Sequence, residues 1–226
     1  MAHPYFHSLS SVSNWGGVHE DYLAVHQWFD RSKQHLGDFR HRALRHHAEG
    51  IDLSRKIFGD EITNRDSVSV PVDQLGRQHI EEDLGYVPAF SDWLEAIDDR
   101  SIPRSEQLSS PIQADRSVLK WGGVESDYLP LHEFLDKAVA GAGRRSLLAR
   151  HHTEGVFLLE TVFGAVITNS EGRVVPVRVI AEFHINNELS RIPPVSEILQ
   201  GIESAPWMMR VARPSRLIMR SLQETS

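Results

Sequence analysis

The sequence predicts a mainly α-helical protein made of two tandem copies of one helical module, each copy with a small β-hairpin. Three observations support this fold class. Several sequence strings occur twice in the same order. In several segments, apolar residues recur every three or four positions, as they do on one face of a helix. Between two such segments, β-branched residues flank a short polar turn, as in a hairpin.

The repeat defines the domains. WGGVHEDYLAVHQWFD begins at residue 15 and recurs as WGGVESDYLPLHEFLD at 121, an offset of 106 residues. RHHAEG begins at 45 and recurs as RHHTEG at 150, an offset of 105, and so nearly constant a spacing indicates a duplication. Because each copy is small for a lone domain, we expect the two to pack about a pseudo-twofold axis. The predicted parts are copy one at 11–97, a polar linker at 98–116, copy two at 117–202 and a basic, apolar tail at 203–226.

The predicted elements of copy one are helices at 21–36, 39–57 and 73–84 and a short helix at 92–97 that Ser91 caps. The string ITNRDSVSVPV at 62–72 predicts the hairpin, with Asn64 shaping its turn. The WGGV string predicts a tight bend with a core tryptophan. Copy two predicts the same elements, with Asn169 in the turn and Ser196 as the cap.

Composition limits the function. The net charge is −7 with histidines neutral, which argues against a nucleic-acid binder, although a local basic patch leaves nucleic acid open as a partner. There are no cysteines, so disulfides and thiolate metal sites are excluded. The absence of a long apolar run excludes a membrane span, and we see no secretory signal, so we expect a cytoplasmic protein. The 13 histidines are the unusual feature.

Both copies keep the same histidines and carboxylates, in three groups. Two groups place a histidine four residues before a carboxylate, so that both share one helix face, and the third is a histidine pair. Three facing helices can bring such groups to one metal ion. The candidate ligands in copy one are His26, Asp30, His46, His47, His79 and Asp83. Those in copy two are His132, Asp136, His151, His152, His184 and Glu188.

Imidazole with carboxylate suits a divalent metal ion such as zinc, iron or manganese. Of each histidine pair we favour His47 and His152, because these lie on the apolar stripe of the predicted helix. A bound metal would activate water, with Glu49 or Glu82 as general base. The structural alternative stays open, because a histidine four residues from a carboxylate is also a common helix hydrogen bond.

Four arginines precede the histidine pairs and allow two interpretations. Their guanidinium groups could bind a phosphate or carboxylate ligand in a bidentate manner. The interpretation we favour is that they pair with acidic side chains of the protein itself, such as Glu49 or Glu154. The four are Arg40, Arg45, Arg145 and Arg150.

At FRHRALRHHAEG, followed by ITN, VPV and QHIEEDLG, the module resembles a family of bacteria and phages known only as a domain of unknown function. The resemblance implies no mechanism. Copy two departs from it at Ser146 and at Asn186 and Asn187, which replace a histidine and two acids of copy one. We therefore expect copy one to bind metal more tightly.

Two functional hypotheses follow, and whether the protein is an enzyme stays open. The first is a metal-binding helical protein, with metal-dependent hydrolysis as its enzymatic form. The second is a non-catalytic interaction or assembly protein with structural histidines, whose basic tail binds a protein partner or a second copy of the chain. The tail could also lie across the interface of the repeats, which we favour.

Overall fold

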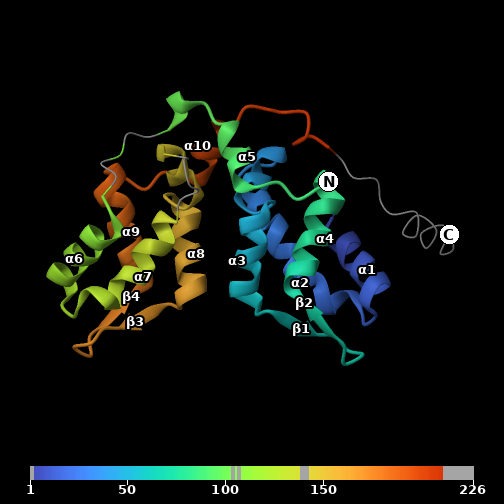
Figure 1. Cartoon of the computed structure of the whole chain (residues 1–226), viewed down its shortest axis with the longest axis horizontal. Coiled ribbons are helices and arrows are strands. Elements are labelled where there is room, and N and C mark those ends of the chain that lie inside the picture. Colours follow the sequence, from blue (N-terminus) through green and yellow to red (C-terminus); the bar gives the residue numbers. More distant parts are fainter. Residues whose placement is uncertain (1–2, 103–104, 106–107, 138–142, 211–226) are drawn as a thin grey trace. The chain divides into compact units, whose positions relative to one another are not determined.

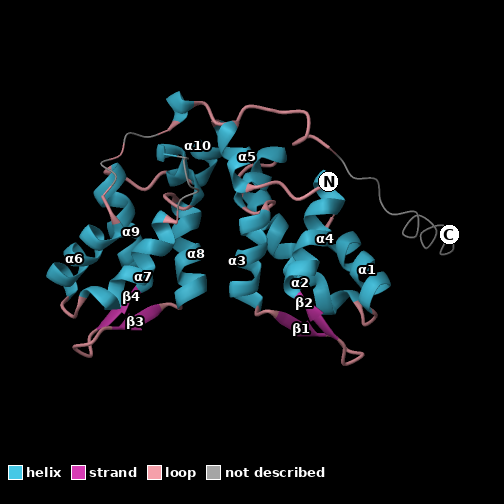
Figure 2. Ribbon diagram, in the orientation of Figure 1, coloured by secondary structure: helices cyan, strands magenta, loops and turns pink. Residues whose placement is uncertain are grey.

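The computed structural model describes residues 3–102, 105, 108–137 and 143–210, and these form two compact units (Figure 1). Both are helical, with strands confined to one two-stranded hairpin in each (Figure 2). The predicted fold class, mainly helical with two copies of a hairpin-bearing module, is confirmed. No helix in the described ranges has both the length and the apolar character needed to cross a membrane.

The elements of copy one follow each other in this order: α1 (Pro4–Trp15), α2 (His19–Asp30), the 3-10 helices η1 (Arg31–Gln34) and η2 (Phe39–Leu44), α3 (Ala48–Phe58), β1 (Glu61–Thr63), β2 (Ser69–Pro71), α4 (Val72–Leu84) and α5 (Phe90–Glu95). The short 3-10 helix η3 (Asp99–Ser101) comes next. Copy two repeats the order: α6 (Ser110–Trp121), α7 (Glu125–Asp136), the 3-10 helix η4 (Gly143–Ala149), α8 (Thr153–Phe163), β3 (Val166–Thr168), β4 (Val174–Pro176), α9 (Val177–Leu189) and α10 (Val195–Gln200).

The hairpin and the WGGV bend are tied together by one asparagine. Gly16 and Gly17 both have positive φ, +76° and +70°, which makes the sharp turn from α1 into α2. Asn64 donates to the carbonyl of Trp15 and to the hydroxyl of Tyr22, while its Oδ1 accepts the backbone N–H groups of the hairpin turn. Asn169 makes the same contacts in copy two, so the predicted turn role is confirmed. The bend is confirmed as well, although Trp15 is only half-buried.

The segment predicted as one helix over 39–57 is two helices, so this prediction was wrong. The chain is extended at His47, with φ −158° and ψ 171°, and the His47 ring caps α3 by accepting the N–H of Gly50. The carbonyl of Arg45 also lies where a Cβ of residue 50 would stand, 1.9 Å away. A glycine is therefore needed for this close approach, and the RHHAEG string encodes a helix start rather than a helix interior.

The boundaries of other elements differ less. Helix α4 begins one residue before its prediction, while α2 ends at Asp30 and continues as η1. Ser91 and Ser196 lie inside α5 and α10 rather than capping them.

Helices α1 and α6 were not predicted, and α6 begins inside the predicted linker. The reason is that their buried faces are polar. In α1 the buried residues are a histidine and three serines, and in α6 two of the three are Gln113 and Ser117. Apolar periodicity cannot detect such a helix, because the face that packs on the neighbouring helices has few apolar residues.

Each unit also contains a segment from beyond its own copy. Among the described residues, unit 1 comprises 3–93 and 204–210, and unit 2 comprises those between 94 and 203. In unit 1 the Trp207 ring lies 4.7 Å from that of Trp93, and Met208 is fully buried. Two residues of the predicted tail, Trp207 and Met208, therefore pack on unit 1, and Arg210 is exposed. The other arginines of the tail, Arg213, Arg216 and Arg220, lie outside the described residues.

We expect Met208→Ala to lower the free energy of unfolding by about 2–5 kcal/mol, the usual cost of truncating a buried methionine. Met209→Ala is the matched control, because Met209 is 60 % exposed. Thermal denaturation of the two variants checks the prediction. Equal melting temperatures would contradict the packing of this segment.

Candidate metal centres

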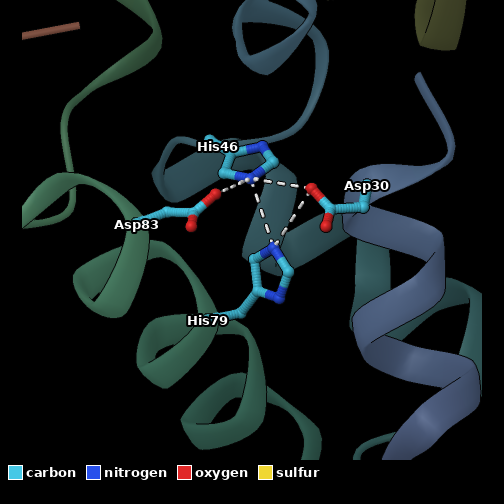
Figure 3. A group of neighbouring side chains, drawn as sticks. All are labelled: Asp30, His46, His79 and Asp83. Carbon is cyan, nitrogen blue, oxygen red and sulfur yellow. Dashed lines mark hydrogen bonds and ion pairs between the residues drawn. The ribbon is translucent and has the colours of Figure 1, made fainter. Parts of the chain in front are cut away.

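Copy one brings four ionisable side chains together in its interior (Figure 3). Asp30 comes from the end of α2, His79 and Asp83 lie one turn apart on α4, and His46 lies in the turn before α3. All four are buried. We call this group centre 1.

The ligand atoms of centre 1 surround a common point. The Nε2 atoms of His46 and His79 are 3.2 Å apart, and each lies 3.8 Å from Oδ1 of Asp30. Oδ2 of Asp83 is 3.3 Å from Nε2 of His46. Figure 3 shows these side chains pointing toward one another from three directions.

Copy two holds the equivalent group, centre 2, formed by Asp136, His151, His184 and Glu188. The two Nε2 atoms are 2.9 Å apart. Oδ1 of Asp136 is 3.1 Å from Nε2 of His184 and 3.6 Å from that of His151, which in turn lies 3.3 Å from Oε2 of Glu188. The substitution of Asp83 by Glu188 therefore preserves the convergence.

These separations fit a tetrahedral metal site. In a tetrahedron the edge is about 1.6 times the bond, so metal–ligand bonds of about 2.0–2.1 Å place the ligand atoms about 3.3–3.4 Å apart. Four of the six separations in each centre lie between 2.9 and 3.8 Å, on either side of this value, and all ligand atoms of a centre lie within 4.8 Å of one another. Each centre could hold a metal ion, and its two carboxylates would balance the charge of a divalent one.

Oδ1 of Asp30 supports this fit. It is buried and, among the described residues, accepts no hydrogen bond, which is unusual for a carboxylate oxygen in a protein interior. The pKa of Asp83 is lowered: burial would raise it, but hydrogen bonds with His46 and His7 outweigh burial. Centre 1 therefore presents an ionised Asp83 and an unsatisfied Asp30 oxygen to the same point.

A chain of hydrogen bonds behind His79 determines its tautomer. The single hydroxyl proton of Ser11 points to an oxygen acceptor, either Oε1 of Gln78 or the carbonyl of His7, so Oγ accepts from Nε2 of His26, 2.8 Å away. Burial lowers the pKa of His26 well below 6.5, so this ring is neutral and its Nδ1 accepts from Nδ1 of His79 at 3.2 Å. Burial also lowers the pKa of His79, so this ring is neutral with its proton on Nδ1, and its Nε2 turns a lone pair to the centre, where Nε2 of His46 lies 3.2 Å away.

Copy two repeats this chain. Nδ1 of His184 lies 2.9 Å from Nδ1 of His132, and Nε2 of His132 lies 2.9 Å from Oγ of Ser117. Metal-bound histidines commonly have such an outer partner on the other ring nitrogen, which fixes the ring and its tautomer. The predicted ligands His26 and His132 thus lie one layer behind the centres.

The other favoured ligands lie elsewhere. His47 and His152 cap α3 and α8, so the member of each pair that faces the centre is His46 or His151. This reverses our choice within the pair. The apolar-stripe argument assumed that the pair lies inside a helix, whereas the helix begins only after the pair.

The predicted bases also lie outside the centre. Glu49 accepts the N–H of Phe90 and lies 3.3 Å from the His47 ring, and these contacts lower its pKa to about 2, with His47 as the largest cause. Glu82 is bound by His7, whose Nδ1 is 2.6 Å away. Burial alone would lower the pKa of His7, but Asp83 and Glu82 raise it to about 9.

The four arginines of the anion-binding hypothesis have partners within the protein. Arg40 forms a bidentate pair with Asp38, and Arg145 bonds Asp99 at 2.6 Å. Arg45 and Arg150 donate to the carbonyls of Trp28 and Phe134 and lie over those same rings. Pairing with acids, the interpretation we favoured, is thus seen for Arg40 and Arg145, while Arg45 and Arg150 contact backbone and aromatic faces.

Three residues at centre 1 were missed from the sequence: His7, Ser11 and Arg42. Arg42 is 1 % exposed and its Nη2 lies 2.9 Å from Oδ2 of Asp83. The comparison of the two copies led us to set His7 aside, because copy two has Gln113 at the equivalent position. A signal for Ser11 does exist, since SVxxWGGV occurs at residue 11 and again at 117.

Fold and centres together define a duplicated helical protein with one buried histidine–carboxylate cluster per copy. Residues 2–102 and 109–208 each match the family described as Domain of unknown function (DUF6915), and the chain belongs to this family. Neither a curated protein nor a solved structure matches the chain.

We expect stability to fall as the pH drops below about 6.5. Burial lowers the pKa of His132 to about 3 and that of His41 to about 2, so these rings stay neutral when folded and bind protons when unfolded. Each contribution is therefore complete above about pH 6.5 and declines by about 1.4 kcal/mol per pH unit below it. His7 has the opposite sign, and its contribution is lost only as the pH rises toward 9.

Urea unfolding between pH 4 and 7 measures this slope. His132→Gln should reduce it by about one proton, whereas the control His35→Gln should leave it unchanged. Parallel slopes for all three proteins would show that His132 does not carry this effect.

Proposed function

We propose that this protein binds divalent metal ions, zinc, iron or manganese, at centres 1 and 2. The observation that carries the proposal is the convergence of two imidazole nitrogens and two carboxylate oxygens on one point in each copy, at separations close to a tetrahedral edge. Imidazole and carboxylate together suit these metals. In each centre one outer histidine, His26 or His132, orients one ring, His79 or His184, so that its Nε2 faces the centre.

Metal-dependent hydrolysis is the enzymatic form of this proposal. It needs a metal that keeps a position open for water, as catalytic zinc sites do. Two histidines and one carboxylate would leave the fourth position for water, with the second carboxylate as proton acceptor. In centre 2 this proton acceptor would be Glu188 or Asp136. The bases expected from the sequence, Glu49 and Glu82, contact other groups in copy one.

A purely structural role for the histidines is the second candidate, and one observation favours it in copy one. Arg42 pairs with Asp83, and Lys33 Nζ lies 2.6 Å from Oδ2 of Asp30. These cations balance both carboxylates without a metal, and His46 can then donate from Nε2 to Asp83. Such a cluster would hold the helices of an interaction or assembly protein.

The adjacent histidines provide a matched test. We expect His46→Ala to lose one equivalent of metal because a ligand is removed. We expect His47→Ala to retain it while losing about 1 kcal/mol of stability with the helix cap. Elemental analysis of the purified proteins, after incubation with zinc and desalting, measures the stoichiometry.

Asp30→Asn serves as a second ligand variant of nearly unchanged volume. If the wild-type chain retains no zinc, iron or manganese, the metal-binding proposal fails and the structural role stands.

A further inference from the structure

Centres 1 and 2 differ most at two neighbouring positions. Copy one has His41 and Arg42, both buried, where copy two has Ser146 and Leu147. Arg42 fills the space beside Asp83 and pairs with it, and the His41 ring lies 5.6 Å from that of His46. In copy one the approach to the centre is thus filled by two large polar side chains.

In copy two the smaller side chains leave a pocket of about 370 Å³ that reaches the centre. The side chain of Asp136 is 23 % exposed, against 4 % for Asp30. Three of the four centre residues, Asp136, His151 and Glu188, line the pocket. The rest of its wall includes Ser109, Ser110, Pro111, Glu133, Ser146 and Leu147.

The charges around the two centres also differ, and again centre 2 is the more accessible to a cation. In centre 1 Lys33 and Arg42 each pair with one carboxylate. In the described part of copy two no lysine or arginine pairs with Asp136 or Glu188, and Asp136 instead accepts a hydrogen bond from Ser110 at 2.5 Å. A divalent cation would therefore meet two unneutralised carboxylates in centre 2, but an arginine and a lysine in centre 1.

We propose, on the basis of the metal-binding function above, that centre 2 is the exchangeable, ligand-binding metal site and that centre 1 is closed by Arg42. If one of the two carboxylates lay beside the metal rather than bound to it, the pocket would admit a small polar molecule to the remaining ligand position. Because Asp136 and Glu188 balance a divalent ion, the charge left in the pocket is that of Glu133, so the favoured ligand is neutral or cationic, such as an amine or a polyol.

This proposal gives a different reason for a difference between the copies than the one that led us to expect tighter metal binding in copy one. That expectation counted Asn186 and Asn187 as lost acids of the site. Asn187 bonds Gln113, just as Glu82, its counterpart, is bound by His7. Glu82 and Asn187 thus serve contacts between helices, and Glu81 pairs with Arg77 on its own helix. The substitution that matters for metal access is Arg42 by Leu147.

The test exchanges these two residues in the full-length chain. Zinc-loaded wild-type protein is mixed with the chromophoric chelator pyridylazoresorcinol, and the release of each equivalent is timed. We expect one equivalent, that of centre 2, to leave at least about 10-fold faster than the other, within the 10- to 100-fold range typical of residues next to metal ligands. Leu147→Arg should abolish the fast equivalent, and Arg42→Leu should speed the slow one.

Cobalt-loaded protein tests ligand access by visible absorption. Imidazole should change the spectrum of wild type and Arg42→Leu, but not of Leu147→Arg. Azide, an anion, should bind more weakly than imidazole and gain affinity in Glu133→Gln.

The outcomes separate the two proposals. If no metal binds, the proposed function itself fails. If two equivalents leave at the same rate in wild type and both variants, metal binding stands and the difference between the centres is refuted. If Leu147→Arg does not fold, Ser146→His replaces it, because this side chain also fills the pocket; imidazole binding unchanged in this variant would overturn the proposal.

Discussion

Each copy places two carboxylates and two imidazoles in the middle of a small helical module, and much of the local structure serves to stabilise these ionisable groups there. Buried ionisable groups are costly unless they are paired, hydrogen-bonded or bound to a metal. Around centre 1 the protein supplies an outer histidine, a serine and a glutamine behind His79. It also supplies Arg42 and His7 beside Asp83. The buried face of α1 is polar for the same reason: it packs against ionisable side chains rather than against an apolar core.

This constraint explains which parts of the fold were predictable. Helix α4 was predicted almost to the residue, because Leu75, Ile80 and Leu84 are fully buried and recur at helical spacing. Helix α1 was invisible to the same criterion, since its buried residues are His7 and serines. A sequence pattern records the burial of apolar side chains well, but it does not record burial that is stabilised by hydrogen bonds to a polar cluster.

The candidate site was predicted in composition more than in detail. Asp30, His79 and Asp83 were found because four-residue spacing on a helix determines a shared face. The choice between His46 and His47 required knowing where α3 begins, and that depends on the Arg45 carbonyl approaching Gly50. In the sequence, such a backbone contact is visible only as a glycine. The role of Arg42 was equally hidden, because its partner Asp83 is 41 residues away in a sequence of 226.

Arg42 also connects centre 1 to the segment at 208–210. Its Nη1 donates to the carbonyls of Met208 and Arg210 at 3.1 and 3.3 Å, while its Nη2 pairs with Asp83. One buried guanidinium thus satisfies backbone groups of the incoming segment and a carboxylate of the centre at once, a use suited to its planar fork of donors. In copy two Leu147 has no donor with which to do either. A single position of the repeat therefore decides two properties together: whether a following segment is held beside the centre, and whether a cation already occupies the place next to its carboxylate. After the duplication the two copies differ at this position, so a buried arginine stands beside the carboxylate of centre 1 and an apolar leucine occupies the equivalent place in copy two.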